Sequence, residues 1–306
     1  MNMYALVSRD TAPVLIPEMY PDLSLSIMEN INQFLSNKAY LYSESQLYAY
    51  VTILPKTFIE FSVEDISDVS SEFFEKWLIT FSSSKAKQTI ANRISILSSF
   101  FNYCIEANIL TKSPILRKFR CKIPIHTVRI LDEKEYQKVK REAENLPILS
   151  RTVFEVFDSS GIKCNELISL KLKDLDFENR LATITGKGKK KTRVVPLSYI
   201  AIYLLREITS NKSINDYVFS IKKGKCIHRS TALSMINYLG QKAGLEISLF
   251  PSMLRNGFSS RLFLQGLILE EIREILGNKS IQNTREDIDS IEISMQYYYD
   301  KVMTNK

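Results

Sequence analysis

The sequence has few of the residue types on which many metal sites and hydrolytic sites depend. Two histidines occur among 306 residues, so a metal site built on imidazole or a Ser-His-Asp triad has almost no raw material. The four cysteines lie far apart without a C-x-x-C pair, which argues against a disulfide framework and a zinc site. We therefore expect no metal. The residues are His126, His228, Cys104, Cys121, Cys164 and Cys226.

Long apolar runs and glycine-rich loops are also missing. No apolar run approaches the ~20 residues that cross a bilayer, and residues 1–20 lack the basic start and continuous apolar stretch of a secretory signal. We expect a cytoplasmic protein without a membrane partner. The sequence contains no phosphate-binding loop of the Walker or dinucleotide type and no internal repeat.

The positive charge is concentrated in the later part of the chain. Residues 1–126 hold 12 Lys+Arg and 12 Asp+Glu, which leaves 29 of the 41 basic and 22 of the 34 acidic residues for the remainder. A basic surface on one domain indicates a phosphate-rich partner such as nucleic acid. The alternative is a generally basic soluble protein. Hydrophobic residues at 45% are enough for two cores in a chain of this length.

The first part of the chain reads as a small helical domain. Apolar residues recur at steps of three and four in residues 24–35, 70–81 and 87–110. Residues 112–124 carry five positive charges and no acid, which predicts an extended basic linker. The expected boundaries are an N-terminal extension at 1–22, a helical domain at 23–111, a linker at 112–128 and a second domain at 129–306.

Polar and basic residues at the start of the third helical segment, together with the linker, are candidate phosphate contacts. The alternative for the helix is a solvated face. An apolar stripe on the other side of the same segment, including Ile90 and Leu97, is expected to be core. The candidates are Lys85, Lys87, Gln88, Asn92, Arg93, Lys118 and Arg120.

The second domain combines helices with a short β-hairpin. Asp132 and Glu135 have capping-box spacing before a helix. Two β-rich runs, at 181–185 and 193–197, flank a lysine-loaded turn. Helical patterns follow, which predicts a mainly α fold with a small β-sheet (α+β). These helices are expected around residues 151–159, 200–208, 230–243, 254–264 and 270–276.

Several stretches of this domain resemble motifs of the tyrosine recombinase (phage integrase) family, especially its Xer-like members. Residues 161–167 (GIKCNEL) match a G-x-R-x-x-E-L segment with lysine at the arginine position, and 186–188 (GKG) with 195–197 (VPL) match the family's hairpin. Residues 251–255 (PSMLR) match P-H-x-L-R with serine for histidine, and 276–278 (LGN) match L-G-H. The resemblance covers about four-fifths of the chain.

The resemblance implies a catalytic set that ends in a tyrosine nucleophile. The text ISMQYYYD aligns Ser294 and Asp300 with the threonine and histidine around that tyrosine, which selects Tyr298 among three consecutive tyrosines. Tyr298 follows Asn278 by twenty positions, about twice the family's usual interval, and the charged stretch NTREDIDS is inserted between them. The implied catalytic residues are Tyr298, Arg255, Lys187, Lys163, Ser252 and Asn278.

These residue types suit attack on a phosphodiester. Fixed cations and hydrogen-bond donors stabilise the charge that develops on the phosphate, and neighbouring cations favour the phenolate of a tyrosine whose ordinary pKa is ~10. The resemblance implies that Lys187 protonates the departing hydroxyl and Arg255 grips the non-bridging oxygens. Glu166 is expected to support its neighbours or the helix start. Lys189, Lys190 and Arg193 are expected to contact DNA or to form a solvated hairpin tip.

Three interpretations follow from these patterns. The leading one is a DNA recombinase or integrase, of the kind carried by mobile genetic elements, that binds double-stranded DNA, associates as a dimer to tetramer on it and needs no cofactor. The second is a DNA-binding relative that has lost strand cleavage, because Lys163 lacks the planar fork of arginine and Ser252 cannot carry charge. The third, an unrelated helical transcription regulator, does not explain the hairpin followed by P-x-x-L-R.

Overall fold

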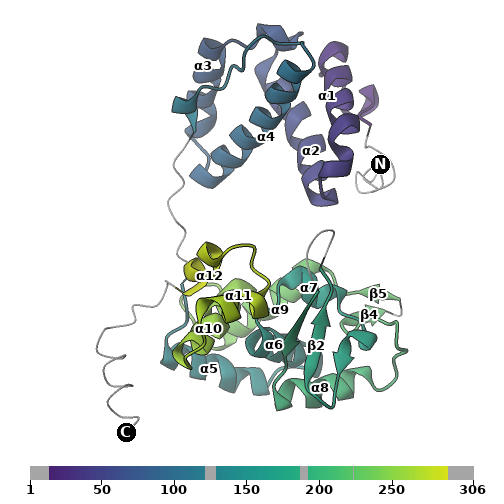
Figure 1. Ribbon diagram of the computed structural model, residues 1–306, viewed down its shortest axis with the longest axis vertical. Helices are drawn as coiled ribbons and strands as arrows, with labels where there is room; N and C mark the ends of the chain where they lie inside the picture. Colours follow the sequence, from purple (N-terminus) through teal and green to yellow (C-terminus); the bar gives the residue numbers. More distant parts are fainter. Residues whose placement is uncertain (1–13, 121–128, 187–191, 223, 289–306) are drawn as a thin grey trace. The chain divides into compact units, whose positions relative to one another are not determined.

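The computed structural model describes residues 14–120, 129–186, 192–222 and 224–288 (Figure 1). The chain divides into two compact units, Met1–Ile125 and His126–Lys306, each with its own hydrophobic core. None of the helices in the described ranges is long and apolar enough to cross a membrane. The fold is mainly helical with small antiparallel sheets, which confirms the predicted fold class.

The first unit is built from four α-helices. Ser43 and Gln46 form a capping box at the start of the second, and the Ser70 side chain accepts a hydrogen bond from the Phe73 backbone N–H at the start of the third. The second helix is missing from the sequence prediction. The helices are α1 Leu25–Lys38, α2 Glu44–Phe61, α3 Ser71–Ser82 and α4 Lys87–Glu106.

Aromatic rings fill the core between these helices. Phe34 of α1 is fully buried and meets the rings of Tyr50, Phe100 and Tyr103 edge-on, with centroids 5.1 to 5.5 Å apart. The predicted apolar stripe of α4, including Ile90 and Leu97, is buried in the same core. The helical character of this region is therefore confirmed.

The basic stretch after α4 is attached to the first unit as far as it is described. Its 3-10 turn, Arg117–Phe119, buries Phe119 at 6% exposure, and Phe119 meets the ring of Phe74 at 5.4 Å. Ile115 packs against the same core. Residues 112–120 thus differ from the extended linker that the charge pattern predicts, because two apolar side chains anchor them.

Helix α6 is the central helix of the second unit, and eight of its residues are buried. Asp132 and Glu135 form the predicted capping box at the start of α5. Helix α12, which lies beside α10 and α11 (Figure 1), is missing from the sequence prediction. The helices are α5 Glu133–Glu144, α6 Ile148–Ser160, α7 Cys164–Ser169, α8 Tyr199–Thr209, α9 Arg229–Lys242, α10 Pro251–Leu264, α11 Leu269–Leu276 and α12 Ile281–Ile288.

A three-stranded antiparallel sheet of order β1-β2-β3 covers part of this core. The predicted hairpin is confirmed, and its register pairs Ala182 with Val195 and Ile184 with Arg193. A separate two-stranded sheet lies farther along the chain. The strands are β1 Leu175–Asp176, β2 Leu181–Ile184, β3 Arg193–Pro196, β4 Ser220–Lys222 and β5 Lys225–Cys226.

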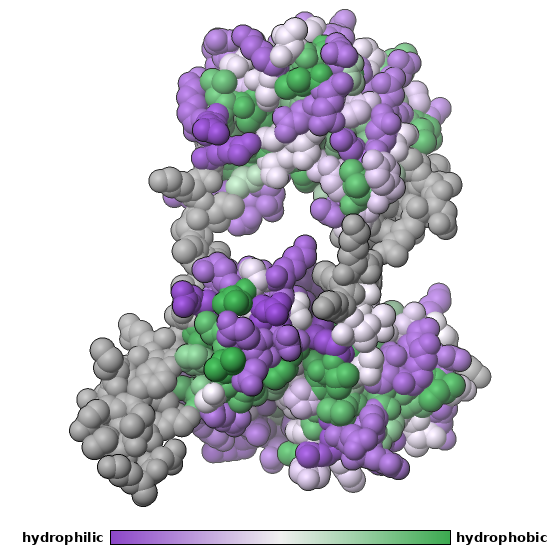
Figure 2. Space-filling model, in the orientation of Figure 1, coloured by the Kyte–Doolittle hydropathy of each residue, from purple (hydrophilic) through white to green (hydrophobic). Residues whose placement is uncertain are grey.

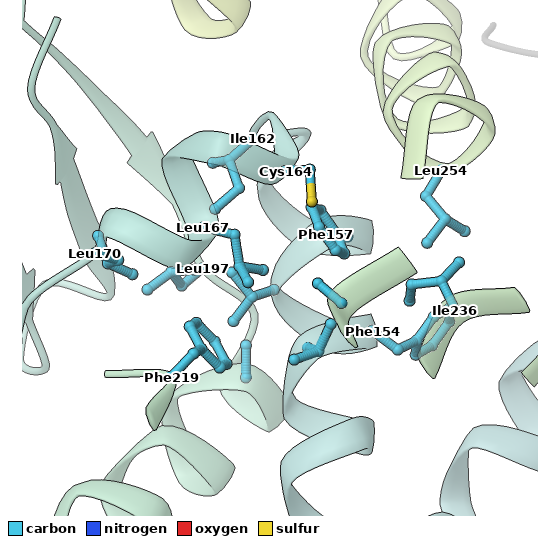
Figure 3. Packing of buried hydrophobic residues seen from close by; sticks show 14 of the residues in the cluster. Phe154, Phe157, Ile162, Cys164, Leu167, Leu170, Leu197, Phe219, Ile236 and Leu254 are labelled. Atoms are coloured by element: carbon cyan, nitrogen blue, oxygen red, sulfur yellow. The ribbon is translucent and has the colours of Figure 1, made fainter. Parts of the chain in front are cut away.

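The core of the second unit brings together side chains from α6, α7, α9, α10 and the strands. Phe154 and Phe157 of α6 are fully buried, and Figure 3 shows them among Leu167, Ile236 and Leu254. Hydrophilic side chains predominate on the surface seen in Figure 2, interrupted by smaller apolar patches. The start of α10 belongs to this core through Met253 and Leu254, while α11 packs through Ile272 and Leu276 in a separate, smaller cluster.

Candidate active site

Arg255 lies within α10 and is almost fully buried, with 7% exposure. Its Nη1 donates to the carbonyl of Gly161, and its Nη2 donates to the carbonyl of Leu276 at 2.8 Å and to Asn278 Oδ1 at 2.9 Å. Gly161 caps α6 and Leu276 ends α11, so the guanidinium binds the negative ends of two helix dipoles. Arg255 is thereby fixed as a cation at the meeting point of three helices.

Two glycines make this arrangement possible. Gly161 has φ +60°, and a Cβ there would lie 2.5 Å from Phe258 Cδ1. Gly277 has φ +63°, and a Cβ there would lie 2.9 Å from the Nη1 of Arg193. At both positions the positive φ is unfavourable for a residue with a side chain, and neighbouring atoms leave no room for a Cβ. Each helix end therefore requires glycine. The glycines of the GIKCNEL and LGN motifs therefore have a structural reason.

Glu166 and Arg193 form a two-pronged ion pair close to this point. Arg193 Nη1 and Nη2 donate to the two Glu166 oxygens at 2.9 and 2.7 Å, and Arg193 Nε donates to the Ile275 carbonyl at 2.9 Å. Burial raises the pKa of Glu166, but hydrogen bonds from Arg193 and from the Lys163 backbone N–H outweigh it and leave the pKa below its usual value. Glu166 thus accepts hydrogen bonds from Arg193 and from the backbone at the start of α7. The sequence predicts that Arg193 contacts DNA or lies in a solvated hairpin tip, whereas its guanidinium binds Glu166 and Ile275 within the unit.

Lys163 and Ser252 present their side chains at the surface near this network. Lys163 is the N-cap of α7, two residues after Gly161, and its side chain is exposed. Ser252 is exposed on the first turn of α10, one turn before Arg255 and therefore on the same side of the helix. Both side chains are thus exposed at helix starts, Lys163 at that of α7 and Ser252 at that of α10.

Asn278 connects Arg255 to α12. Its Oδ1 accepts from Arg255, while its Nδ2 donates to Asp287 Oδ2 at 2.8 Å and to Thr284 Oγ1 at 3.2 Å. Both the oxygen and the nitrogen of the Asn278 amide are therefore hydrogen-bonded. Asp287 also lies 4.0 Å from Arg255 Nε, measured from Oδ2. Asp287 is not singled out by the sequence patterns, because residues 283–290 are interpreted there as an insertion. The unusually long interval between Asn278 and Tyr298 is the sequence signal that indicates this segment.

The buried position of Arg255 has an electrostatic consequence. Burial lowers the pKa of its guanidinium, and the charges of Asp287 and Glu166 act in the opposite direction. A guanidinium remains protonated under all ordinary conditions. Arg255 is therefore a permanent charge whose nearby counter-ions belong to the protein itself.

Four predicted residues lie outside the described ranges: the hairpin lysines Lys187, Lys189 and Lys190, and Tyr298. Tyr297 and Tyr299 lie outside them as well. The described part of the chain therefore supplies Lys163, Ser252, Arg255 and Asn278 of the predicted catalytic set. It contains no group of three or more His, Cys, Asp or Glu side chains able to hold a metal ion.

The candidate DNA contacts of the first unit differ in their surroundings. Lys85 and Lys87 are exposed, and so are Gln88 and Asn92, whose side chains hydrogen-bond to each other at 3.0 Å. Arg93 instead pairs with Glu60 at 2.7 Å and lies 4.3 Å from the centroid of the Phe81 ring.

The two candidates beyond α4 are both exposed. Lys118 pairs with Glu75 at 2.8 Å, and Arg120 follows the buried Phe119. Because an exposed ion pair contributes at most about 1 kcal/mol, the pairing leaves Lys118 available to a phosphate.

Comparisons with known proteins agree with this arrangement. The model of the phage integrase family matches residues 129–288. A tyrosine recombinase of Pseudothermotoga lettingae is 30% identical over 271 residues, covering 84% of this chain and 91% of that protein. Tyrosine recombinase XerC of Xanthomonas axonopodis pv. citri is 29% identical over 202 residues, covering 65% of this chain and 66% of that protein.

Solved structures show the same fold. The XerH site-specific recombinase bound to its difH substrate has a TM-score of 0.68 and 21% identity, covering 88% of this chain and 89% of that one. The Tn1549 transposon integrase in complex with circular intermediate DNA has a TM-score of 0.69 and 16% identity, covering 92% of this chain and 100% of that one. With the family model matched over the whole described part of the second unit, the chain belongs to the phage integrase family of tyrosine recombinases.

Proposed function

We propose that the chain is a site-specific DNA recombinase that cuts and rejoins double-stranded DNA through a covalent 3′-phosphotyrosyl intermediate. The observation that carries the proposal is the buried guanidinium of Arg255, which two helix ends and Asn278 hold in place. Preorganised charge of this kind stabilises a phosphoryl transition state without reorganisation during the reaction. The relatives, which are named tyrosine recombinases, support the same function.

In the proposed reaction the Tyr298 oxygen attacks the scissile phosphorus and the bond from phosphorus to the 5′ oxygen breaks. Lys187 protonates that departing oxygen, and the phenolic proton leaves to solvent. A 5′-hydroxyl of another strand then attacks the phosphotyrosyl ester and releases Tyr298. The phosphotyrosyl ester conserves the energy of the broken phosphodiester bond, so neither step consumes a nucleoside triphosphate. We propose that no metal or other cofactor takes part.

The remaining residues have supporting tasks in this proposal. Lys163 supplies a second positive charge, and Ser252 donates a neutral hydrogen bond to the phosphate. Asn278 holds Arg255 through its amide oxygen. Phosphate contacts from Lys85, Lys87, Gln88, Asn92, Lys118, Arg120, Lys189 and Lys190 would hold the duplex. Association of two to four copies on DNA remains part of the proposal.

The proposed function is tested on nicked duplexes that carry a binding site selected from a randomised library by the purified chain. A nick beside the scissile phosphate lets the short product diffuse away and traps the covalent complex. We expect a protein–DNA band that survives denaturant and disappears on protease treatment. No such band on a verified site contradicts strand cleavage.

A second candidate function is DNA binding without cleavage. The specific observation that favours it is Asp287, which puts a carboxylate beside the guanidinium that is expected to bind phosphate. Lysine at 163 and serine at 252 also favour this candidate, because each binds a phosphate less strongly than the arginine or histidine of the family motif. The covalent band separates the two candidates.

Replacing Lys163 by arginine is expected to maintain or raise the rate of adduct formation. Arginine restores a planar, two-pronged hydrogen bond to phosphate at an exposed position that already carries positive charge. The rate is measured on the nicked site, with Lys163→Gln as the matched control. Glutamine removes the charge and should slow the reaction at least tenfold, while equal rates for all three proteins would exclude Lys163 from the site.

DNA binding is expected to weaken steeply with salt, and Arg120→Gln should reduce the log-log slope by about one unit. Arg120 is exposed beside the anchored Phe119, so its loss removes one phosphate contact without disturbing the core. Affinities are measured by fluorescence anisotropy at several salt concentrations. Lys76→Gln, at an exposed lysine of α3, is the control and should leave the slope unchanged. An equal change in both variants would show a general charge effect.

A further inference from the structure

Asp287 on the last turn of α12 lies where an anion bound to Arg255 is expected. Its Oδ2 accepts from Asn278 Nδ2 at 2.8 Å and lies 4.0 Å from Arg255 Nε. The Asp287 side chain is 25% exposed and that of Arg255 is 8% exposed. Among the described residues, this is the only carboxylate within 4.0 Å of the guanidinium. An internal anion therefore faces the buried cation of the candidate site.

The edge of Arg255 that faces Asp287 still has hydrogen-bonding capacity. Nη1 and Nη2 are used by the carbonyls of Gly161 and Leu276 and by Asn278 Oδ1. Nε has no acceptor within hydrogen-bonding distance in the described part of the chain, since Asp287 Oδ2 lies too far away at 4.0 Å. A phosphate oxygen that binds side-on to the guanidinium uses this N–H.

A phosphate and the Asp287 carboxylate cannot both occupy this edge at low cost. A charge-assisted hydrogen bond brings the acceptor oxygen to ~2.8 Å from nitrogen, and the Asp287 carboxylate oxygen lies only 4.0 Å from the same nitrogen. Two anions a few ångströms apart in a partly buried place repel each other strongly. Binding of one therefore favours departure of the other.

The position of Asp287 in the sequence supports the same conclusion. Tyr298 follows Asn278 at about twice the interval that is usual in the family, and half of that interval ends at the last turn of α12. The match to the family model also ends there, at Ile288. In this chain a carboxylate accepts a hydrogen bond from Asn278 and lies 4.0 Å from Arg255 Nε, close to the point where the match to the family model ends.

We propose that Asp287 is an internal competitor for phosphate: it occupies the open edge of Arg255 in the DNA-free chain, and a DNA phosphate binds Arg255 only after the carboxylate leaves. The contact keeps the site closed in the absence of DNA. The competition rests on the proposed function only in that Arg255 binds a DNA phosphate. It does not require strand cleavage. A chain that forms no covalent adduct therefore contradicts cleavage and leaves the competition intact.

The test compares Asp287→Asn with the unchanged chain and with Glu286→Gln. Glu286 is an exposed acid on the same helix turn, so its variant removes an equal charge away from Arg255. Melting temperatures are recorded against inorganic phosphate, and affinity is measured with a 30-base-pair duplex. Asp287→Asn should bind phosphate and duplex about tenfold more tightly than both other proteins. Equal phosphate dependence in the three proteins overturns the proposal.

A second measurement tests the proposal without the Asp287→Asn variant, in case that variant does not fold. In the unchanged chain, amide hydrogen exchange of residues 281–288 is compared with and without saturating duplex. Departure of the carboxylate removes the contact with Asn278 and Arg255, so exchange in the last turn of α12 should become several-fold faster on DNA. Unchanged or slower exchange in α12 contradicts the proposal.

Discussion

Tyr298→Phe is expected to abolish the covalent protein–DNA adduct while DNA affinity stays within a few-fold of the unchanged chain. The substitution removes only the phenolic oxygen that is proposed to attack phosphorus, and it leaves the ring and the positive charges that bind the DNA backbone unchanged. Adduct is measured as denaturant-resistant label on a nicked site, and affinity is measured by anisotropy on the same duplex.

Tyr297→Phe and Tyr299→Phe are the matched controls, since each removes the same atom one position away. Consecutive side chains point in different directions in helices and in strands alike, so we expect only one of the three phenols to face a given phosphate. Both controls should retain the adduct. Loss of the adduct in Tyr297→Phe with retention in Tyr298→Phe would move the nucleophile by one position.

Arg255→Ala is expected to destabilise the second unit by about 3–5 kcal/mol in addition to abolishing the adduct. The buried guanidinium satisfies the carbonyls of Gly161 and Leu276 and the amide oxygen of Asn278. Its removal leaves these three acceptors without that donor and the Asp287 carboxylate without its nearby cation. Urea unfolding is followed by circular dichroism. The single tryptophan, Trp77, packs against the core of the first unit and reports that unit separately.

Arg273→Ala is the control for this effect. Arg273 lies on α11 with a side chain that is 33% exposed, and its guanidinium nitrogen lies 3.7 Å from the exposed Glu274. Its loss should change the unfolding free energy by less than about 1 kcal/mol. In Arg255→Ala the Trp77 fluorescence transition should stay in place while the dichroism transition moves to lower urea. A shift of both transitions, or of neither, contradicts the structural role of Arg255.

Much of the fold is predictable from local patterns. The capping box at Asp132 and the hairpin at 181–197 depend on residues close together in the sequence, and both are confirmed. Helix α2 contains Pro55 in its interior, which weakens a helical pattern read from the sequence alone. The Phe119 anchor was missed because five positive charges dominate the composition of its segment, whereas burial of one ring decides its position.

The site was predictable in its residue types and less so in its contacts. The motifs around Arg255 and Asn278 identify both residues, and the structure brings their side chains within hydrogen-bonding distance. Asp287 depends on how α10, α11 and α12 pack, which no local pattern contains. Thr284 and Ile288, four residues apart and both buried, are the sequence signal that the charged stretch forms a helix.

The most direct test of the central claim is to identify the residue that carries the DNA. The adduct formed on the nicked site is digested with nuclease and protease, and the nucleotide-bearing peptide is sequenced by mass spectrometry. We predict a nucleotide attached through its 3′-phosphate to Tyr298. Attachment to another residue would contradict the assignment of the nucleophile. If the unchanged chain forms no adduct on a verified site, while Lys163→Arg combined with Ser252→His forms one, the chain is a DNA-binding member of the family without strand cleavage.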